Sequence, residues 1–457
     1  MSELLPRQEI ESALKGHEAD YLELRLDDTS TNRIVYRGRE LEEIGRTRSF
    51  GGNARALVSG GWGFASFNDA RDLRKRVAEA VNQARHVGGN GSTLAEVPPV
   101  VDIVPLSVAK DPRLIPLAAK KEILDRYNET MLAVDGVTST NITYWDGHKR
   151  TVFASSEGSY IEQERIDVVS RLAATARKNG DMQQSSMSLG ALNDFSYIEE
   201  MGETARRIGQ RAVELLSAPY VKAGTYPVVL DPILAGVFCH EAFGHLSESD
   251  FVYENERMKE IMVLGRQFGQ PHLNIVDGAA VPDLRGSYKY DDEGVPARKT
   301  DLIRDGILVG RLHSRETAGK MGEPTSGNAR ALDYRFPPIV RMTNTYIERG
   351  DMTFEDVIAD IKEGVYARNW FGGTTSMEMF TFSAGEAYMI RNGEVAELLR
   401  PVKLTGNLFT TLMNIDALGN DMDFNQGGGC GKAGQMPLPV SNGSPHIRIQ
   451  DCVVGER

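Results

Sequence analysis

Cysteine is scarce in this sequence, with only three among 457 residues. Three cysteines cannot build a disulfide framework, so the sequence predicts either a reducing compartment or cysteines with a chemical role. The N-terminal segment lacks a positively charged stretch followed by an apolar one, which argues against a secretory signal peptide. Together these absences predict a cytoplasmic protein.

Long hydrophobic runs and an excess of positive charge are lacking as well. No apolar run approaches the roughly 18 residues that a membrane-spanning helix requires. The formal net charge is −12, and a negative surface repels phosphate backbones and anionic membranes. We therefore expect neither nucleic acid nor a membrane as a partner.

The chain is longer than one hydrophobic core usually organises, which predicts two or three domains. Alternating short runs in residues 20–66 and helical patterns at 115–132 and 197–216 predict an N-terminal mixed α/β domain with an antiparallel sheet, residues 1–221. A segment rich in Pro, Gly and small residues then marks a boundary. Residues 222–457 hold hairpin turns and few helices, which predicts a curled or barrel-like β domain carrying a metal-site helix. The fold class is α+β.

One tight turn is expected inside the first domain. The apolar-polar runs NITYW and KRTVFAS flank the dipeptide Asp146-Gly147. This dipeptide suits the positive φ angles of a two-residue hairpin, so the sequence predicts two short strands joined there.

The motif with the clearest chemical content is H-E-x-x-x-H, formed by His240, Glu241 and His245. It is one residue longer than the H-E-x-x-H motif of many zinc peptidases. In an α-helix, residues four apart differ by about 40° around the axis and residues five apart by about 140°. A regular helix would therefore point the two imidazoles away from one common ion.

Two local arrangements would remove this conflict. A single π-type turn, with i→i+5 bonding, would return the imidazoles to one face, and such turns concentrate at functional sites. Gly244 would ease such a rearrangement because it lacks a Cβ. Alternatively, the helix ends between the two histidines. The spacing does not distinguish these two arrangements.

A catalytic zinc ion usually has three protein ligands and one open position. Cys430 is the candidate for the third, since the glycines around it allow close approach of the backbone to an ion. Lys432 and the ion would both favour its thiolate form. Glu241 cannot face the ion as the histidines do, but it can reach a metal-activated water and act as the base.

The other cysteines and one nearby carboxylate have competing interpretations. Cys239 precedes the first histidine and Cys452 lies in an alternating strand, so buried packing thiols are the expected roles. Glu248 is either a fourth ligand or a partner that orients a histidine, or it is a solvated surface carboxylate.

Three further groups are weak metal candidates. His272 and His313 stand alone in the sequence, so we expect neither to be a ligand. Residues 291–293, with the sequence DDE, look like an acidic metal cluster, but the glycine after them fits a hairpin turn equally well.

Four ordered segments resemble the TldD/PmbA family, and specifically its TldD branch. They cover much of the second half of the chain, whereas the first half matches the family mainly in length and layout. The segments are HEAFGHLSESD at 240–250, YKYDDEGVPARKT at 288–300, SGNARALDYRFPPIVRMTNTYI at 326–347 and CGKAGQMPLPVSNGSPHIRI at 430–449.

The resemblance implies a zinc-dependent peptidase of two domains, with the metal held by a barrel-like β domain. It implies that His240, His245 and Cys430 bind the zinc and that Glu241 is the base. It also implies a partner, either a homologous PmbA/TldE-like subunit or a second copy, and unfolded or short peptides as substrates. The substrate-binding residues are not implied.

Two other functions fit the same residues. One is a zinc-stabilised module that binds peptides or a partner protein without proteolytic activity. The other is a zinc amidase that acts on a small molecule. Substituting Glu241 by Gln separates the binding module from a peptidase, because a binder does not use a base.

Overall fold

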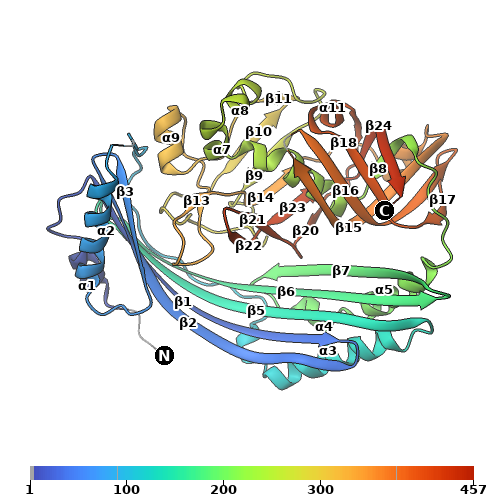
Figure 1. Cartoon of the computed structure of the whole chain (residues 1–457), viewed down its shortest axis with the longest axis horizontal. Helices are drawn as coiled ribbons and strands as arrows, with labels where there is room; N and C mark the ends of the chain where they lie inside the picture. Colours follow the sequence, from blue (N-terminus) through green and yellow to red (C-terminus); the bar gives the residue numbers. More distant parts are fainter. Residues whose placement is uncertain (1–4, 90, 377, 457) are drawn as a thin grey trace.

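The first half of the chain forms one long, curved sheet that lies along the second half (Figure 1). The protein is described by a computed structural model covering residues 5–89, 91–376 and 378–456. The strand order is β3-β2-β1-β5-β6-β4, with β7 also paired to β6. The strands are β1 (Tyr21–Arg37), β2 (Glu40–Val58), β3 (Gly61–Phe67), β4 (Val101–Ile103), β5 (Val137–Ser155), β6 (Tyr160–Lys178) and β7 (Asp181–Leu192).

Two groups of helices pack against this sheet and bury its apolar residues in two separate cores. On α2, the positions Val77, Val81 and Ala84 follow helical spacing and are all buried against the first strands. The elements are α1 (Arg7–Ala13), α2 (Leu73–Val87), the 3₁₀ turn η1 (Pro112–Leu114), α3 (Leu117–Leu132), α4 (Ser196–Glu199) and α5 (Gly202–Glu214).

The hairpin expected at Asp146-Gly147 is not formed. Both residues lie inside β5, which runs without interruption for 19 residues. Asp146 is buried and accepts hydrogen bonds from Lys120 and Tyr144, each 2.6 Å long. A Cβ on Gly147 would lie 2.6 Å from the Trp145 ring, so glycine here makes room for that ring. The prediction was wrong because tertiary contacts, not a turn, select these two residues.

The second half contains a closed five-stranded barrel, as the sequence predicted, and the α+β fold class is confirmed. Its order is β15-β8-β24-β18-β16, and β15 also pairs with β16. The barrel strands are β8 (Gly224–Leu230), β15 (Glu363–Ser376), β16 (Met379–Arg391), β18 (Val402–Asn407) and β24 (Ile447–Glu456). Strands β17 (Glu394–Leu399) and β19 (Ile415–Leu418) extend the same sheet.

A second sheet lies beside the barrel, with the order β11-β10-β9-β14-β23-β20, together with two short ribbons, β12-β13 and β21-β22. The remaining strands are β9 (Ile275–Gly278), β10 (Lys299–Arg304), β11 (Ile307–Leu308), β12 (Ala329–Arg330), β13 (Ile339–Val340), β14 (Asn344–Ile347), β20 (Asp423–Asn425), β21 (Gly429–Lys432), β22 (Gln435–Pro439) and β23 (Ser441–Ser444). The remaining helices are α6 (Pro232–Cys239), α7 (Ser249–Glu254), α8 (Glu256–Ile261), α9 (Arg315–Met321), α10 (Phe354–Ile358) and α11 (Leu408–Met413).

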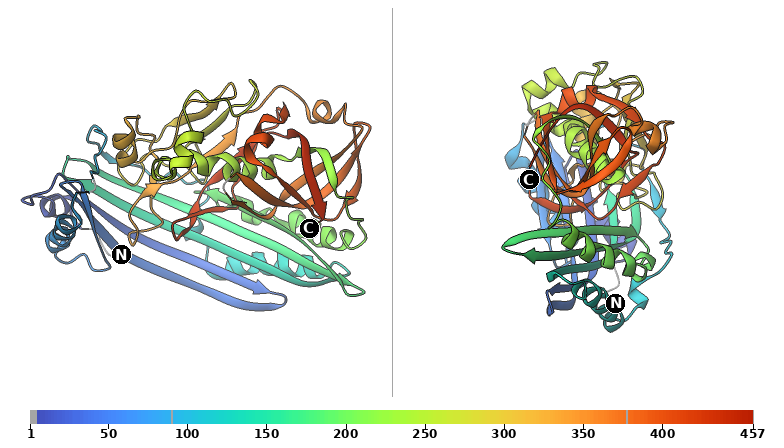
Figure 2. Two further views of the ribbon diagram at one scale, coloured as in Figure 1. Left: turned by 45° about the horizontal axis from the view of Figure 1, so that its top comes forward. Right: turned by 90° about the vertical axis from the view of Figure 1, so that its right-hand side faces the viewer.

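Ion pairs with a buried arginine join the two halves, which lie one above the other in Figure 2. Arg285 donates to both oxygens of Asp167 on β6, at 2.8 and 3.2 Å. Arg315 makes a similar two-bond contact with Glu157, at 2.7 and 2.9 Å. The division of the chain at residue 221 remains a prediction. Within the described part of the chain, no helix is long and apolar enough to cross a membrane.

Candidate functional site

The helix α6, which leads directly into the first histidine, is fixed at both ends. Asp231 caps its N-terminus by accepting from the backbone N–H of Leu234 at 2.9 Å, and Pro232 occupies the first turn. On its barrel side, Phe238 makes edge-on contacts with Phe380 and Phe382. The helix is therefore anchored in the barrel core directly before the histidine motif.

A π turn follows the helix, spanning His240–Gly244. The backbone N–H of His245 bonds to the carbonyl of His240, the i→i+5 bond that defines such a turn. A 3₁₀ turn, His245–Ser247, comes next. Of the two arrangements that the motif allowed, the chain adopts the π turn.

Gly244 serves this turn through packing. Its backbone is right-handed helical, with φ −57° and ψ −52°, a conformation open to any residue. A Cβ at this position would lie 2.0 Å from the sulfur of Met342, which is impossible without a shift of the chain. Glycine is needed here because Met342 packs against the backbone. The backbone angles of the π turn do not themselves require glycine.

The turn brings together the two histidines and the distant cysteine. One ligand atom each from His240, His245 and Cys430 lies within 4.8 Å of the other two. The sulfur of Cys430 is 3.6 Å from Nε2 of His245, and the two imidazole rings have centroids 5.1 Å apart. Nδ1 of His240 is buried and has no hydrogen-bond partner among the described residues. Among all His, Cys, Asp and Glu side chains of the described part of the chain, this is the one group of three or more with metal-ligand spacing.

Charges around the cluster favour a thiolate. Burial opposes ionisation of Cys430, but the charges of His240 and His245 and their hydrogen bonds outweigh it and lower its pKa to about 5. Burial also opposes the charged form of His245, yet Glu248 and then Cys430 raise the pKa of this histidine well above its usual value. Two imidazoles and a thiolate are a donor set suited to a borderline-soft divalent ion.

Glu248 is a buried partner of His245, which excludes the solvated surface role. It is 1% exposed and accepts a hydrogen bond from Nδ1 of His245 at 3.0 Å. This contact fixes the imidazole so that Nε2 faces Cys430. Burial would raise the pKa of Glu248, but the neighbouring charges of His245 and Lys432 lower it to about 2.

Lys432 supports the carboxylates and not the thiol. Its ammonium lies 3.1 Å from Glu248 and 2.6 Å from Asp250. It also donates to the carbonyl of Val340 at 2.9 Å. The expectation that Lys432 stabilises the thiolate was therefore wrong, because the lysine is committed to partners on the other side of the imidazole.

Arg341 holds the strand that carries the cysteine. Its side chain is completely buried and donates to the carbonyl of Cys430 at 2.8 Å and to that of Gln435 at 3.2 Å. Both carbonyls belong to the ribbon β21-β22. The position of the third candidate ligand thus depends on a charged side chain about ninety positions earlier in the chain.

Glu241 lies on the open side of the π turn. It is half-buried, whereas its neighbours His240 and Ala242 are buried. Among the described residues it has no hydrogen-bond or ion-pair partner. A carboxylate left free in this way, next to a predicted metal ligand, is available to a water or a substrate.

The other sequence candidates have structural roles. Cys239 and Cys452 are buried in the barrel core, and burial raises the pKa of Cys452 to about 12. His272 contacts the carbonyl of Ile415, and His313 contacts Glu323, away from the cluster.

Residues 291–293 form a turn, as one of their two interpretations proposed. Gly294 adopts a positive φ of 76°. Asp291 accepts from the backbone N–H groups of Glu293 and Val295, at 3.0 and 2.9 Å. Glu293 pairs with Arg55 across the boundary between the halves. These carboxylates are used by backbone and arginine donors, so the acidic metal interpretation was wrong.

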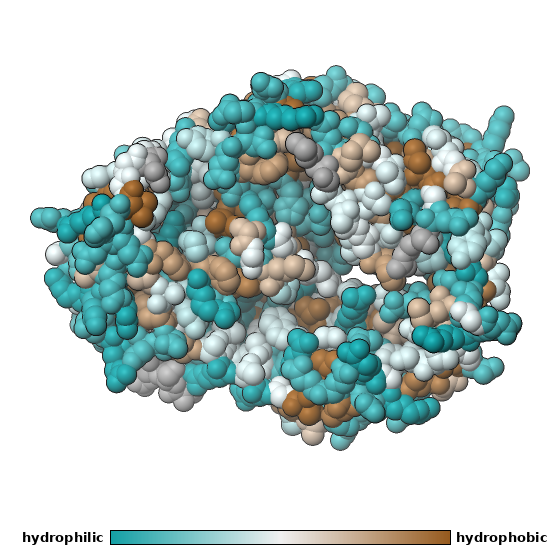
Figure 3. Space-filling view, viewed as in Figure 1, coloured by the Kyte–Doolittle hydropathy of each residue, from teal (hydrophilic) through white to brown (hydrophobic). Residues whose placement is uncertain are grey.

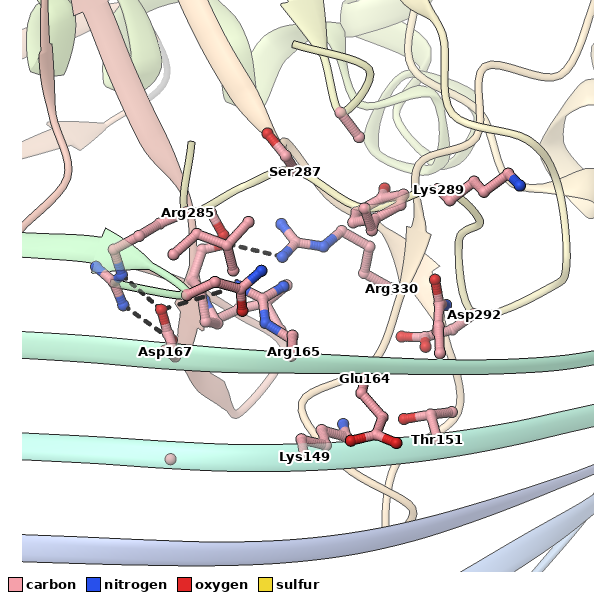
Figure 4. Close-up of a pocket in the computed structure, with 18 of the residues that line it drawn as sticks. Lys149, Thr151, Glu164, Arg165, Asp167, Arg285, Ser287, Lys289, Asp292 and Arg330 are labelled. Atoms are coloured by element: carbon pink, nitrogen blue, oxygen red, sulfur yellow. Dashed lines mark hydrogen bonds and ion pairs between the residues drawn. The ribbon is translucent and has the colours of Figure 1, made fainter. Parts of the chain in front are cut away.

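A cavity of about 1030 Å³ lies between the sheet and the second half (Figure 4). Strands β5 and β6 line one side, and three of the four family-like segments supply most of the other, including Tyr288, Arg330 and Pro439. Gly427, Gly428 and Gly429 line it immediately before Cys430. The space-filling view shows the molecule hollowed between its two halves (Figure 3). Sequence reasoning did not predict this cavity. It named Gly147, Asp291 and Asp292, which line it, but only as parts of turns or of a metal cluster, because the cavity walls come from segments far apart in the chain.

Comparisons with known proteins agree with this architecture. The chain matches three successive family descriptions: PmbA/TldA metallopeptidase domain 1 over residues 22–87, the central domain over 110–216 and the C-terminal domain over 223–456. These matches define the class of the protein, a metallopeptidase of the PmbA/TldA type. The chain belongs to the PmbA/TldD family, as the four segments predicted.

Individual relatives extend the match to nearly the whole chain. A metalloprotease of Synechocystis is 49% identical over 441 residues, which are 96% of this chain and 95% of that protein. A zinc metalloprotease TldD homolog of Saccharolobus solfataricus is 33% identical over 70% of this chain and 72% of its own length. The crystal structure of TldE from Thermococcus kodakarensis has the same fold, with a TM-score of 0.78 at 16% identity over 98% of both chains.

Proposed function

We propose that this protein is a zinc-dependent peptidase that hydrolyses peptide bonds in unfolded or short peptides. The proposal depends mainly on the cluster of His240, His245 and Cys430. The two histidines share one face because a π turn, and not a regular helix, lies between them. We assign these three residues as zinc ligands and Glu241 as the base.

The spacing of the cluster supports zinc. Typical Zn–S and Zn–N bonds of about 2.3 and 2.05 Å at a tetrahedral angle place sulfur and nitrogen about 3.6 Å apart. In the structure, the sulfur of Cys430 and Nε2 of His245 are 3.6 Å apart. The name of the Saccharolobus relative also specifies zinc.

In this proposal each residue has one task. When bound, zinc supplies a Lewis acid that polarises the scissile carbonyl and acidifies a water. Glu241 accepts the proton of the attacking water and passes it to the leaving amine. Glu248 keeps His245 in the tautomer whose Nε2 is free to bind the ion. The cavity beside Cys430 holds the peptide.

Removal of zinc tests the proposal most directly. Dialysis against a chelator is expected to abolish hydrolysis of an unstructured peptide, and one equivalent of zinc is expected to restore it. A tightly folded protein should resist cleavage before and after zinc is returned, because only an extended chain fits between the two halves. Full activity in the metal-free protein would contradict the proposal.

We propose further that the protein works in the cytoplasm with a TldE-like homologous subunit or as a homodimer. The similarity to TldE supports the pairing, and the three free cysteines support a reducing compartment. Light scattering of the purified chain is expected to give twice the mass of one chain, or to do so only after a TldE-like subunit is added. A single-chain mass under both conditions would exclude the pairing.

A further inference from the structure

Two arginines face the cavity from opposite sides. Arg165 projects from β6 in the first half, and Arg330 projects from β12 in the second (Figure 4). They lie close enough for the charge of Arg165 to lower the pKa of Arg330, after the larger effect of burial. The two guanidinium groups therefore share one region of the cavity.

Arg330 has no carboxylate partner in the described part of the chain. It is 4% exposed, and it donates to the carbonyls of Met342 at 2.6 Å and Pro439 at 2.7 Å. Its guanidinium lies 5.4 Å from the centre of the Tyr288 ring. Two neutral carbonyls use two of its five N–H groups. Its charge is offset only at longer range, by the carboxylates of Asp292 and Asp167.

Arg165 is only weakly compensated. It donates to the carbonyl of Arg285 at 2.7 Å, and its Nε is buried without a hydrogen-bond partner. Asp167 lies 3.8 Å away, beyond hydrogen-bonding distance. Both oxygens of that carboxylate are already used by Arg285. The neighbouring lysines have closer carboxylate partners, at 3.3 Å for Lys149 and 2.6 Å for Lys289.

Partly desolvated cations whose charge is only partly compensated cost free energy, and a bound anion would offset that cost. Planar guanidinium groups match the two oxygens of a carboxylate better than an ammonium does. A peptide carries this chemistry either at its C-terminus or on an Asp or Glu side chain. Phosphate groups are a poorer match for a peptidase cavity that also contains the carboxylates of Asp291 and Asp292.

We propose that Arg165 and Arg330 bind a carboxylate of the substrate peptide inside this cavity. The proposal rests on the proposed peptidase function and specifies which peptides the site prefers. Arg330 is also tied to elements of the proposed metal site. It bonds to the carbonyl of Met342, which packs on the π turn, and to that of Pro439, which pairs with Gly429 beside Cys430.

Binding is measured on the Glu241→Gln variant, which keeps the peptide intact. Fluorescence anisotropy compares three labelled peptides: one with a free C-terminus and no acidic side chain, its C-terminal amide, and the amide with one Glu near the end. A free α-carboxylate is expected to lower Kd about 10- to 100-fold relative to the amide, the range of a charged hydrogen-bond pair. If the third peptide alone binds tightly, the carboxylate is that of a side chain.

Adding Arg165→Gln is expected to remove the preference and leave the Kd of the amide unchanged. Arg171→Gln, at an exposed position of the same strand, is the matched control and should keep the preference. Equal Kd values for all three peptides, or an equal loss for all three in the arginine variant, would overturn the proposal. Hydrolysis by the wild type is scored separately, so loss of the peptidase function and loss of the carboxylate preference are distinct results.

Discussion

Glu241→Gln is expected to lower kcat by about 10²- to 10⁴-fold, the usual contribution of a general base. Zinc content should stay at the wild-type level, because Glu241 is not part of the cluster of ligand atoms. The amide is close in size to the carboxylate but cannot accept the proton of the attacking water. The measurement is kcat on an unstructured peptide together with metal analysis of the same sample.

The matched control is Glu254→Gln, an exposed glutamate on α7 in the next turns of the chain. It should leave both kcat and zinc content unchanged. If Glu241→Gln hydrolyses the peptide as fast as the wild type, the carboxylate is not the base. A different outcome is that neither the wild type nor Glu241→Gln cleaves peptides but both bind them equally well. In that case the protein is better described as a non-proteolytic binding module.

Cys430→Ser is expected to reduce bound zinc from about one equivalent per chain to a small fraction of that, since two imidazoles alone hold zinc poorly. Serine keeps the size of the side chain but has a hydroxyl that does not ionise near neutral pH. Activity should fall in proportion to the zinc that is lost. Cobalt-substituted wild type should show a sulfur-to-cobalt charge-transfer absorption that the variant lacks.

Cys452→Ser provides the comparison for this experiment, because Cys452 is also buried but lies in the barrel core. It is expected to retain zinc and the cobalt absorption, with some loss of thermal stability. Equal zinc in Cys430→Ser and in the wild type, with unchanged cobalt spectra, would remove the third ligand from the proposed site.

The local geometry of the histidine motif was predictable from the sequence. The five-residue spacing of His240 and His245 is incompatible with one face of a regular helix, so an irregularity was required, and a π turn is present. The barrel also followed from the succession of hairpin signals. Cys430 could be predicted as a candidate ligand because glycines flank it and because the family resemblance implies it.

Features that depend on distant contacts were not predictable in this way. Asp146-Gly147 has the local signature of a turn, yet Lys120 and the Trp145 ring place it in the middle of a strand. Lys432 is two residues from Cys430 but pairs with Glu248 and Asp250 instead. Sequence spacing carries no information on which of several nearby charges a side chain will meet. The arginines of the cavity were missed for the same reason.

The large sequence separation between Cys430 and the histidines affects when the cluster can form during synthesis. Cys430 lies 185 positions after His245. During synthesis the histidine helix emerges long before the sulfur does, so the cluster stays incomplete until residue 430 has left the ribosome. Under the proposed function, a copy that ends before residue 430 is therefore expected to be inactive.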